Sequence, residues 1–261
     1  MSHFSEFGGF TAEERARIRT VISDVDDTIT NDGLLLPEAL SALYRVRESG
    51  RSTLLVTGGS AGWADIYIRQ WPVDAVITES GALMLIRDEG IIRYVENPVL
   101  KKDPTFKKRR ENVLRANEGT VLSSDQYCRL YDIAYDLKFL TSEQKEKLEE
   151  SVKDNGGRVL YSSIHANVVL GDYSKASSIE NFYELYRGHI GMEDVEFDDF
   201  VDRAISFGDG TNDEEMFHLI PYSVGNERVV ENAGKFRYLP SHYCNMPGGI
   251  AFSEVLYDLT K

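Results

Sequence analysis

The sequence predicts an α/β protein in which a parallel sheet is flanked by helices and an α+β unit is inserted into the chain. Three observations predict it. Up to residue 78, short β-branched strands alternate with amphipathic helices, as in a parallel sheet. Over 84–170 this rhythm gives way to paired strands and a hairpin, which build antiparallel sheets. The alternation then resumes, so we expect 1–83 and 171–261 to form one core and 84–170 a separate unit.

Capping residues and apolar runs define the elements of the first part of the core. Thr11 and Glu14 have the spacing of a capping box. Pro37 stands at a first helical position and Gly50 just past a last turn. The expected elements, in order, are a short helix from Thr11, a strand at 21–24, a helix at 37–49, a strand at 52–57, a helix at 60–70 and a strand at 74–78.

The rest of the chain is interpreted in the same way. In the inserted unit we expect strands at 82–86, 91–95, 129–135, 158–163 and 166–170, and helices at 104–117 and 142–154. Two extended pieces that meet near His165 predict a hairpin. Ser174 caps a helix that runs to Arg187. The core is then expected to end with strands at 204–207 and 222–224 and helices at 211–219, 228–234 and 249–259.

Composition excludes several classes of protein. The 261 residues include 43 Asp and Glu against 29 Lys and Arg, a net charge of −14, which disfavours binding to nucleic acid or to an anionic membrane. The only two cysteines, Cys128 and Cys244, lie far apart and indicate neither a disulfide framework nor a zinc site. The N-terminus does not resemble a secretory signal, and no run approaches about 20 apolar residues. We therefore expect a soluble, cytoplasmic protein.

The first candidate site is acidic and follows the first core strand. The string Asp24-Val25-Asp26-Asp27-Thr28 stands at the carboxyl end of that strand, where open α/β sheets bind their ligands. Side chains alternate along an extended backbone, so Asp24 and Asp26 lie on the same side. The repulsion between their like charges is relieved by a proton or a cation. A hard divalent ion such as Mg²⁺ meets this need. The alternative for this string alone is a solvated acidic turn.

A second acidic cluster follows a later strand. Within Ser206-Phe207-Gly208-Asp209-Gly210-Thr211-Asn212-Asp213, the carboxylates of Asp209 and Asp213 offer oxygen ligands and Asn212 can orient them. Alone, the string is also compatible with a helix-capping loop. Two acidic strand ends so far apart in the sequence make a shared metal site the better interpretation.

Two further motifs favour a bound phosphate. Thr57 and Gly58, in the string Thr57-Gly58-Gly59-Ser60, combine a hydroxyl with unhindered backbone N–H groups before a helix. Lys175 opens another helix, where the helix dipole disfavours a cation, so the lysine indicates an anionic partner. Each feature alone is also explained by an ordinary turn or a solvated lysine.

These four motifs, in this order, resemble those of the haloacid dehalogenase superfamily of phosphohydrolases, which has a Rossmann-like core. The long gap between Thr57 and Lys175 resembles the larger cap insertion of that superfamily, and residues 78–82, Thr-Glu-Ser-Gly-Ala, resemble the signature of its subfamily IIB, which includes Cof-like and sucrose-phosphate phosphatases. Two positions depart from the pattern: Asp27 stands where many relatives have Gly, and Gly59 where many have Arg.

The resemblance implies a role for each motif residue. Asp24 would attack phosphorus and form an aspartyl phosphate, while Asp26 would act as general acid and then as general base. The phosphate would be bound by Thr57, Gly58, Lys175 and Asn212. Mg²⁺ would be held by Asp24, Asp26 through its backbone carbonyl, Asp209 and Asp213.

In the cap, Arg129 and His165 are candidates for contacting sugar hydroxyls or a second anionic group of the substrate. The alternative is that Arg129 pairs with an aspartate and that His165 only occupies the hairpin. The sequence thus predicts a Mg²⁺-dependent phosphatase for a small phosphorylated metabolite, with a sugar phosphate preferred. A phosphomutase and a sugar-phosphate-binding protein without turnover are the alternatives.

Overall fold

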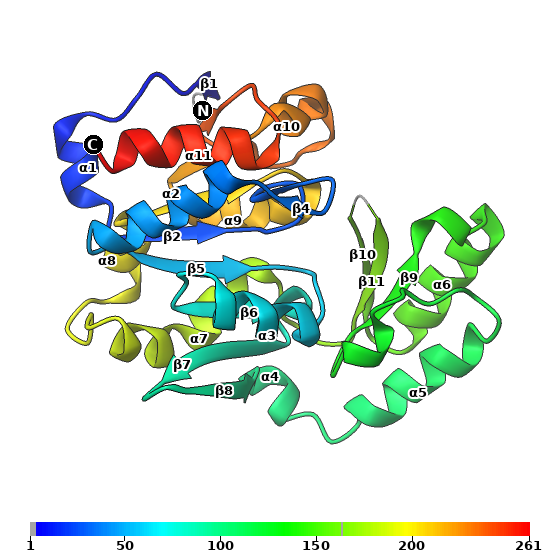
Figure 1. Ribbon diagram of the computed structural model, residues 1–261. Helices are drawn as coiled ribbons and strands as arrows, with labels where there is room; N and C mark the ends of the chain where they lie inside the picture. The colour runs from blue at the N-terminus through cyan, green and yellow to red at the C-terminus, as the bar shows by residue number, and fades with distance from the viewer. Residues whose placement is uncertain (1–3, 163) are drawn as a thin grey trace.

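The computed structural model describes residues 4–162 and 164–261 and confirms the predicted α/β class (Figure 1). Its larger part is built on a nine-stranded sheet. All neighbouring strands are parallel except at one edge, where β6–β7 and β7–β8 are antiparallel. In spatial order the strands are β1 (Ser5–Glu6), β14 (His242–Tyr243), β13 (Tyr222–Gly225), β12 (Ala204–Gly208), β2 (Thr20–Ser23), β5 (Ser52–Val56), β6 (Ala75–Thr78), β7 (Leu83–Asp88) and β8 (Ile91–Glu96).

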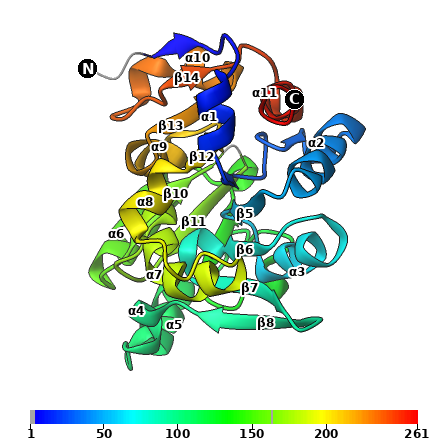
Figure 2. The ribbon, with the colours of Figure 1, turned by 90° about the vertical axis from the view of Figure 1, so that its left-hand side faces the viewer.

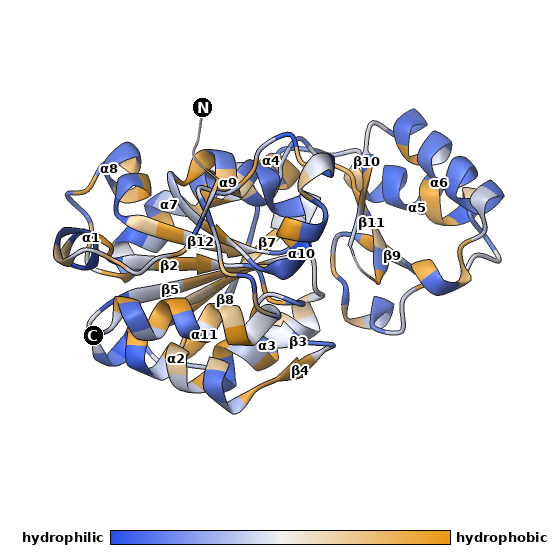
Figure 3. Ribbon diagram, turned by 90° about the horizontal axis from the view of Figure 1, so that it is seen from above, coloured by the Kyte–Doolittle hydropathy of each residue, from blue (hydrophilic) through white to orange (hydrophobic). Residues whose placement is uncertain are grey.

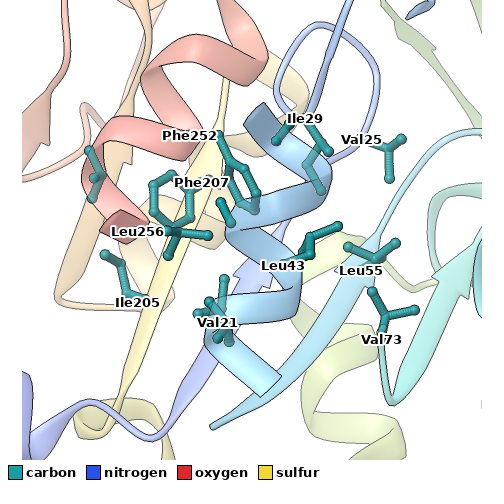
Figure 4. Close-up of a cluster of buried hydrophobic side chains, with 14 of the residues drawn as sticks. Val21, Val25, Ile29, Leu43, Leu55, Val73, Ile205, Phe207, Phe252 and Leu256 are labelled. Atoms are coloured by element: carbon teal, nitrogen blue, oxygen red, sulfur yellow. The ribbon is translucent and has the colours of Figure 1, made fainter. Parts of the chain in front are cut away.

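Helices cover both faces of this sheet (Figure 2). One face carries α2 (Pro37–Glu48), α3 (Ala61–Gln70) and α11 (Gly248–Leu259), and the other carries α7 (Lys175–His189), α8 (Phe197–Asp202) and α9 (Glu214–Leu219). Strand alternation divides the core between these layers. Val21 and Leu55 pack with α2 and α11 (Figure 4), whereas Ile22 and Leu54 pack with α7. The central strands are apolar on both sides because both sides are covered.

The smaller part has its own sheet and its own core. Three antiparallel strands lie in the order β10 (Arg158–Tyr161), β11 (His165–Val169) and β9 (Ile133–Asp136), and α5 (Phe106–Ala116) and α6 (Ser142–Asp154) belong to the same unit. A separate apolar cluster, which includes Val113, Leu148 and Val168, fills it. Figures 1 and 3 show this unit beside the edge of the large sheet toward which β2 and β5 point. It therefore faces the strand ends that carry the acidic motifs.

Residues 84–96 do not lie where the sequence analysis placed them. They form β7 and β8, which extend the large sheet instead of the inserted unit. The physical reason is burial on two sides: Leu85 contributes to the core on one face of the sheet and Met84 to the core on the other. We propose that the inserted unit spans 97–170.

Other expectations need smaller corrections. The strand expected at 129–135 begins only at Ile133, because backbone N–H groups before it donate to Glu79 instead of to a strand. The helix at 211–219 begins as a 3₁₀ turn, and α8 was not expected. Residue 163, in the strand expected at 158–163, lies outside the described residues. The remaining short elements are α1 (Ala12–Arg17), β3 (Thr30–Asn31), β4 (Leu34–Leu35), α4 (Pro98–Lys101) and α10 (Glu227–Glu231).

None of the helices in the described part of the chain is long and apolar enough to span a lipid bilayer.

Candidate active site

The two acidic motifs meet because their strands are neighbours in the sheet. β2 and β12 pair in parallel with Ser23 opposite Phe207, so the two strands end at the same edge of the sheet. The backbone N–H of Asp24 donates to the carbonyl of Phe207 over 3.0 Å. Oxygens of Asp24, Asp209 and Asp213 all lie within 4.8 Å of one another. The clustering of the sequence-predicted metal ligands is thus a feature of the fold.

Lys175 lies inside this acidic cluster. Its Nζ atom is 2.7 Å from Oδ1 of Asp24 and 2.6 Å from Oδ1 of Asp213, and the residue is only 3% exposed. Ser174 caps α7 and thereby fixes the direction in which the lysine leaves the helix. Burial alone would lower the pKa of Lys175, but the two carboxylates outweigh it and raise the pKa. The lysine is therefore a fixed positive charge beside the carboxylate of Asp24.

The site gathers more carboxyl groups than one lysine can balance. Burial raises the pKa of Asp24 well above its usual value; Lys175 opposes this effect, and Asp213 and Asp209 add to it. Burial, followed by the charge of Asp213, raises the pKa of Asp209 to about 7. Hard divalent cations with oxygen ligands relieve such crowding. The donor set therefore fits a metal ion of this kind.

Asp213 also holds its own loop in place. Its Oδ2 accepts hydrogen bonds from the backbone N–H groups of Asp209 at 3.1 Å and Gly210 at 3.2 Å. A Cβ atom at Gly208 would lie 2.6 Å from the Cβ of Asp213, so only glycine allows this approach. The side chain is thus committed to the loop and to Lys175.

Asp26 and Asp27 point to different surroundings. Asp26 is half-buried and lines a cavity that Asp24 and Asp209 also line, and burial raises the pKa of its carboxyl. Asp27 has φ +57° and pairs with Arg228. The Nη1 atom of Arg228 is 2.8 Å from Oδ2 of Asp27 and 3.7 Å from Oδ2 of Asp209. Sequence analysis missed Arg228, since nothing distinguishes a single arginine in a short helix. It brings a cation close to the acidic cluster.

The loop after β5 presents its backbone to the cavity. Gly58 lines the cavity, whereas Thr57 is fully buried and is not among the lining residues of the described chain. Oγ1 of Thr57 accepts a hydrogen bond from the N–H of Gly59 at 2.9 Å. Ser60 caps α3. Thr57 therefore shapes the loop that carries Gly58.

Arg129 does not reach the cavity. Its side chain has no exposed surface and pairs with Asp132 at 2.9 Å and with Asp125 at 3.2 Å, and its Nη1 donates to the carbonyl of Gly58 at 3.0 Å. Pairing with aspartate, the alternative weighed for this residue, is therefore what the structure has. His165 does line the cavity, and burial followed by the charge of Arg129 lowers its pKa.

Glu79 is a buried residue whose role sequence analysis missed. It is 0% exposed and follows β6 with φ +51°. Its carboxylate accepts backbone N–H groups from the start of α3 and from the inserted unit; the donors are Ala61, Leu130, Tyr131 and Asp132. The only sequence signal was its place in the string at 78–82. Glu79 ties the inserted unit to the core.

A cavity of about 300 Å³ opens between the two parts of the protein. Its polar lining comes from both of them. The core contributes Asp24, Asp26, Gly58, Asp209, Asn212, Arg228 and Lys235, and the inserted unit contributes Tyr161, Ser162, His165 and Asn167. Of the predicted site residues, Asp213 and Lys175 are buried and do not line the cavity; Lys175 pairs with both Asp24 and Asp213.

Comparisons with known proteins identify the fold. No protein-family model matches the sequence, and neither does any curated protein. A structure from Thermoplasma acidophilum matches with a TM-score of 0.71 and 16% identity over 93% of this chain and 98% of that one. A phosphatase of the haloacid dehalogenase superfamily from Bacteroides thetaiotaomicron matches at 0.64 and 17% over 98% and 100%. A subclass IIB sugar phosphatase of the same superfamily matches at 0.59 and 14% over 86% and 92%.

The chain therefore has the α/β fold of the haloacid dehalogenase superfamily, as its motifs predicted. Within that superfamily, structures similar to it include a Cof-like hydrolase from Plasmodium vivax, with a TM-score of 0.62 and 15% identity over 95% of this chain and 99% of that one, besides the subclass IIB sugar phosphatase. This is the branch that the sequence resembles.

Proposed function

We propose that this protein is a metal-dependent phosphatase that hydrolyses a small phosphorylated metabolite, a sugar phosphate in preference to other esters. One observation carries the proposal: Asp24, Asp209 and Lys175, which come from three separate elements, converge at the floor of a cavity. Phosphoryl transfer needs an in-line nucleophile together with concentrated positive charge around the transferred group. The fold match to phosphatases supports the same reaction class.

The chain's own residues account for the bonds that form and break. A carboxylate oxygen of Asp24 attacks phosphorus as the bond to the ester oxygen breaks, and Asp26 gives its proton to the leaving oxygen. Asp26 then takes a proton from water, whose oxygen attacks the aspartyl phosphate and frees Asp24 and inorganic phosphate. Burial raises the pKa of Asp26, which suits a residue that must hold a proton before donating it. Lys175 offsets negative charge on Asp24 and on the phosphoryl oxygens.

Mg²⁺ is the metal that we propose for this site. Its ligands would be carboxylate oxygens of Asp24 and Asp209, the backbone carbonyl of Asp26, and Asp213 directly or through water. When bound, the ion neutralises charge on the phosphoryl oxygens and orients the phosphate. Asp213 already bonds to Lys175 and two backbone N–H groups, so its contribution to the ion is best made through water.

The inserted unit would act as the cap that selects the leaving group and keeps bulk water out. Its strands β10 and β11 face the core across the cavity, which suits a small substrate in size. The similarity in fold to a subclass IIB sugar phosphatase supports a sugar phosphate as substrate. We also propose a cytoplasmic location, because Cys128 and Cys244 are both free thiols.

Phosphate release from a panel of phosphorylated metabolites, with and without Mg²⁺, tests this function. Asp24→Asn should abolish release, while Asp154→Asn, at an exposed position of α6, should leave it unchanged. Equal release by the Asp24→Asn variant and the unaltered protein would remove Asp24 as nucleophile. Isomerised substrate with little free phosphate would indicate a phosphomutase, and binding without turnover a sensor.

A further inference from the structure

Asn167 is a buried polar residue that the proposed chemistry does not use. It lies on β11, the central strand of the cap sheet. Because successive side chains of a strand point to opposite faces of the sheet, Asn167 faces away from the side that its two neighbours occupy. Ala166 and Val168 are buried in the apolar core of the inserted unit. Asn167 instead lines the cavity, although only 4% of its surface is exposed.

One end of the Asn167 amide is bonded and the other is free. Nδ2 donates to the carbonyl oxygen of Gly58 over 3.3 Å. Turning the amide over would set Oδ1 against that carbonyl, acceptor against acceptor, so this contact fixes the orientation. Oδ1 is buried and has no hydrogen-bond partner among the described residues. Such an acceptor is costly to leave unpaired, and a site that holds one favours a ligand able to donate to it.

The position of Asn167 indicates which part of a substrate meets Oδ1. A Cβ atom at Gly58 would lie only 2.7 Å from Nδ2 of Asn167, so the amide sits directly against the loop after β5. That loop carries Thr57 and Gly58, to which the motif resemblance assigns phosphate contacts. Phosphoryl oxygens carry no proton to donate at neutral pH, so they do not satisfy an acceptor. The donor must come from the leaving group, close to its ester oxygen.

We propose that Asn167 is a specificity-determining residue, whose Oδ1 accepts a hydrogen bond from a hydroxyl group of the leaving group near the phosphate ester. The protein would then prefer phosphate esters of polyhydroxylated compounds, sugars or polyols, to esters that lack such a hydroxyl. This inference rests on the proposed phosphatase function and names its substrate class.

The test compares glycerol 1-phosphate with propyl phosphate, which has the same carbon chain without hydroxyls. We expect kcat/KM of the unaltered protein to favour glycerol 1-phosphate by about 10- to 100-fold, the range expected when a buried acceptor loses its partner. Asn167→Leu should bring this ratio close to one; loss of the bond from Nδ2 to Gly58 affects both substrates alike, whereas loss of Oδ1 lowers kcat/KM further for glycerol 1-phosphate. Asn112→Leu, at an exposed position of α5, should leave the ratio unchanged.

Two further outcomes are informative. An unaltered ratio in Asn167→Leu, or no preference in the unaltered protein, would overturn the inference. If Asn167→Leu fails to fold, Asn167→Ser keeps a hydroxyl acceptor at the position and should retain part of the preference, whereas Asn167→Ala should lose it. Release of phosphate from propyl phosphate that requires Asp24 shows that the phosphatase function holds even where the hydroxyl preference does not.

Discussion

Glu79 gives the sharpest test of how the two parts of the protein are joined. Its Oε1 accepts the N–H groups of Ala61 at 3.1 Å and Leu130 at 2.9 Å. Its Oε2 accepts those of Tyr131 at 2.7 Å and Asp132 at 3.0 Å. Glu79→Gln replaces one of these oxygens by an NH₂ group, which donates and cannot accept. Two backbone N–H groups of the described structure then lose their partner.

The cost follows from those two donors. A buried donor that loses its partner costs about 1–3 kcal/mol, so Glu79→Gln should lower the free energy of unfolding by about 2–6 kcal/mol. This is a large share of the roughly 5–15 kcal/mol that folded proteins have. Glu79→Ala should cost more, because all four N–H groups lose their acceptor.

Urea unfolding followed by circular dichroism measures this free energy, and hydrogen exchange reports on the individual amides. In Glu79→Gln we expect exchange to accelerate at one pair of amides, either Ala61 and Leu130 or Tyr131 and Asp132, according to which oxygen becomes the NH₂ group. Glu118→Gln makes the same chemical change at an exposed position and should alter neither measurement. A free energy of unfolding within about 0.5 kcal/mol of the unaltered protein, with unchanged exchange at these amides, would refute the reasoning.

Three further predictions concern the cavity. Lys175→Met should lower the free energy of unfolding at pH 7.5 by about 3–5 kcal/mol, because two buried carboxylates lose their partner. Urea unfolding measures this loss, and a loss below about 1 kcal/mol would contradict the prediction. Mg²⁺ at 100 times its Kd should add about 2.7 kcal/mol to the stability of the unaltered protein and raise its Tm. The Asp209→Asn variant should lose most of this rise in Tm. An equal rise in the variant and the unaltered protein would place the ion elsewhere. The His165 ring should titrate below its ordinary pKa of 6.5 in an NMR titration. Because the unfolded chain then binds the proton more readily, the contribution of His165 to stability is complete above pH 6.5 and is lost as the pH falls through 6.5 toward the folded-state pKa; a midpoint above 6.5 would be the contrary result.

The proximity of the residues at the floor of the candidate site could be predicted from the sequence, for a local reason. Each motif directly follows a buried strand or opens a helix, and parallel strands end at one edge of their sheet. Asp24 and Asp209 therefore had to lie close together once β2 and β12 were parallel neighbours. Lys175 follows a capping serine and was predicted as the partner of an anion; in the structure it lies between two carboxylates.

The sequence could not decide what depends on contacts between the inserted unit and the core. Arg129 was compatible with a substrate contact or an ion pair, and only the folded position of Asp132 and Gly58 selects the ion pair. The strands β7 and β8 were expected in the inserted unit but extend the large sheet, because the sequence pattern of a hairpin does not show which sheet its strands join.

The sequence by itself determined the α/β class, the alternation of the central strands and helices of the core, and the acidic and basic residues at the strand ends. Periodicity, helix caps and strand-end motifs depend on residues that are close together in the sequence, so they can be recognised from the sequence alone. Only the tertiary structure decided that Glu79 joins the two units and that Asn167 lines the cavity with a buried amide oxygen that has no partner among the described residues. Those roles arise from partners more than 50 residues away, and a side chain does not reveal its distant partners until the backbone has brought them together.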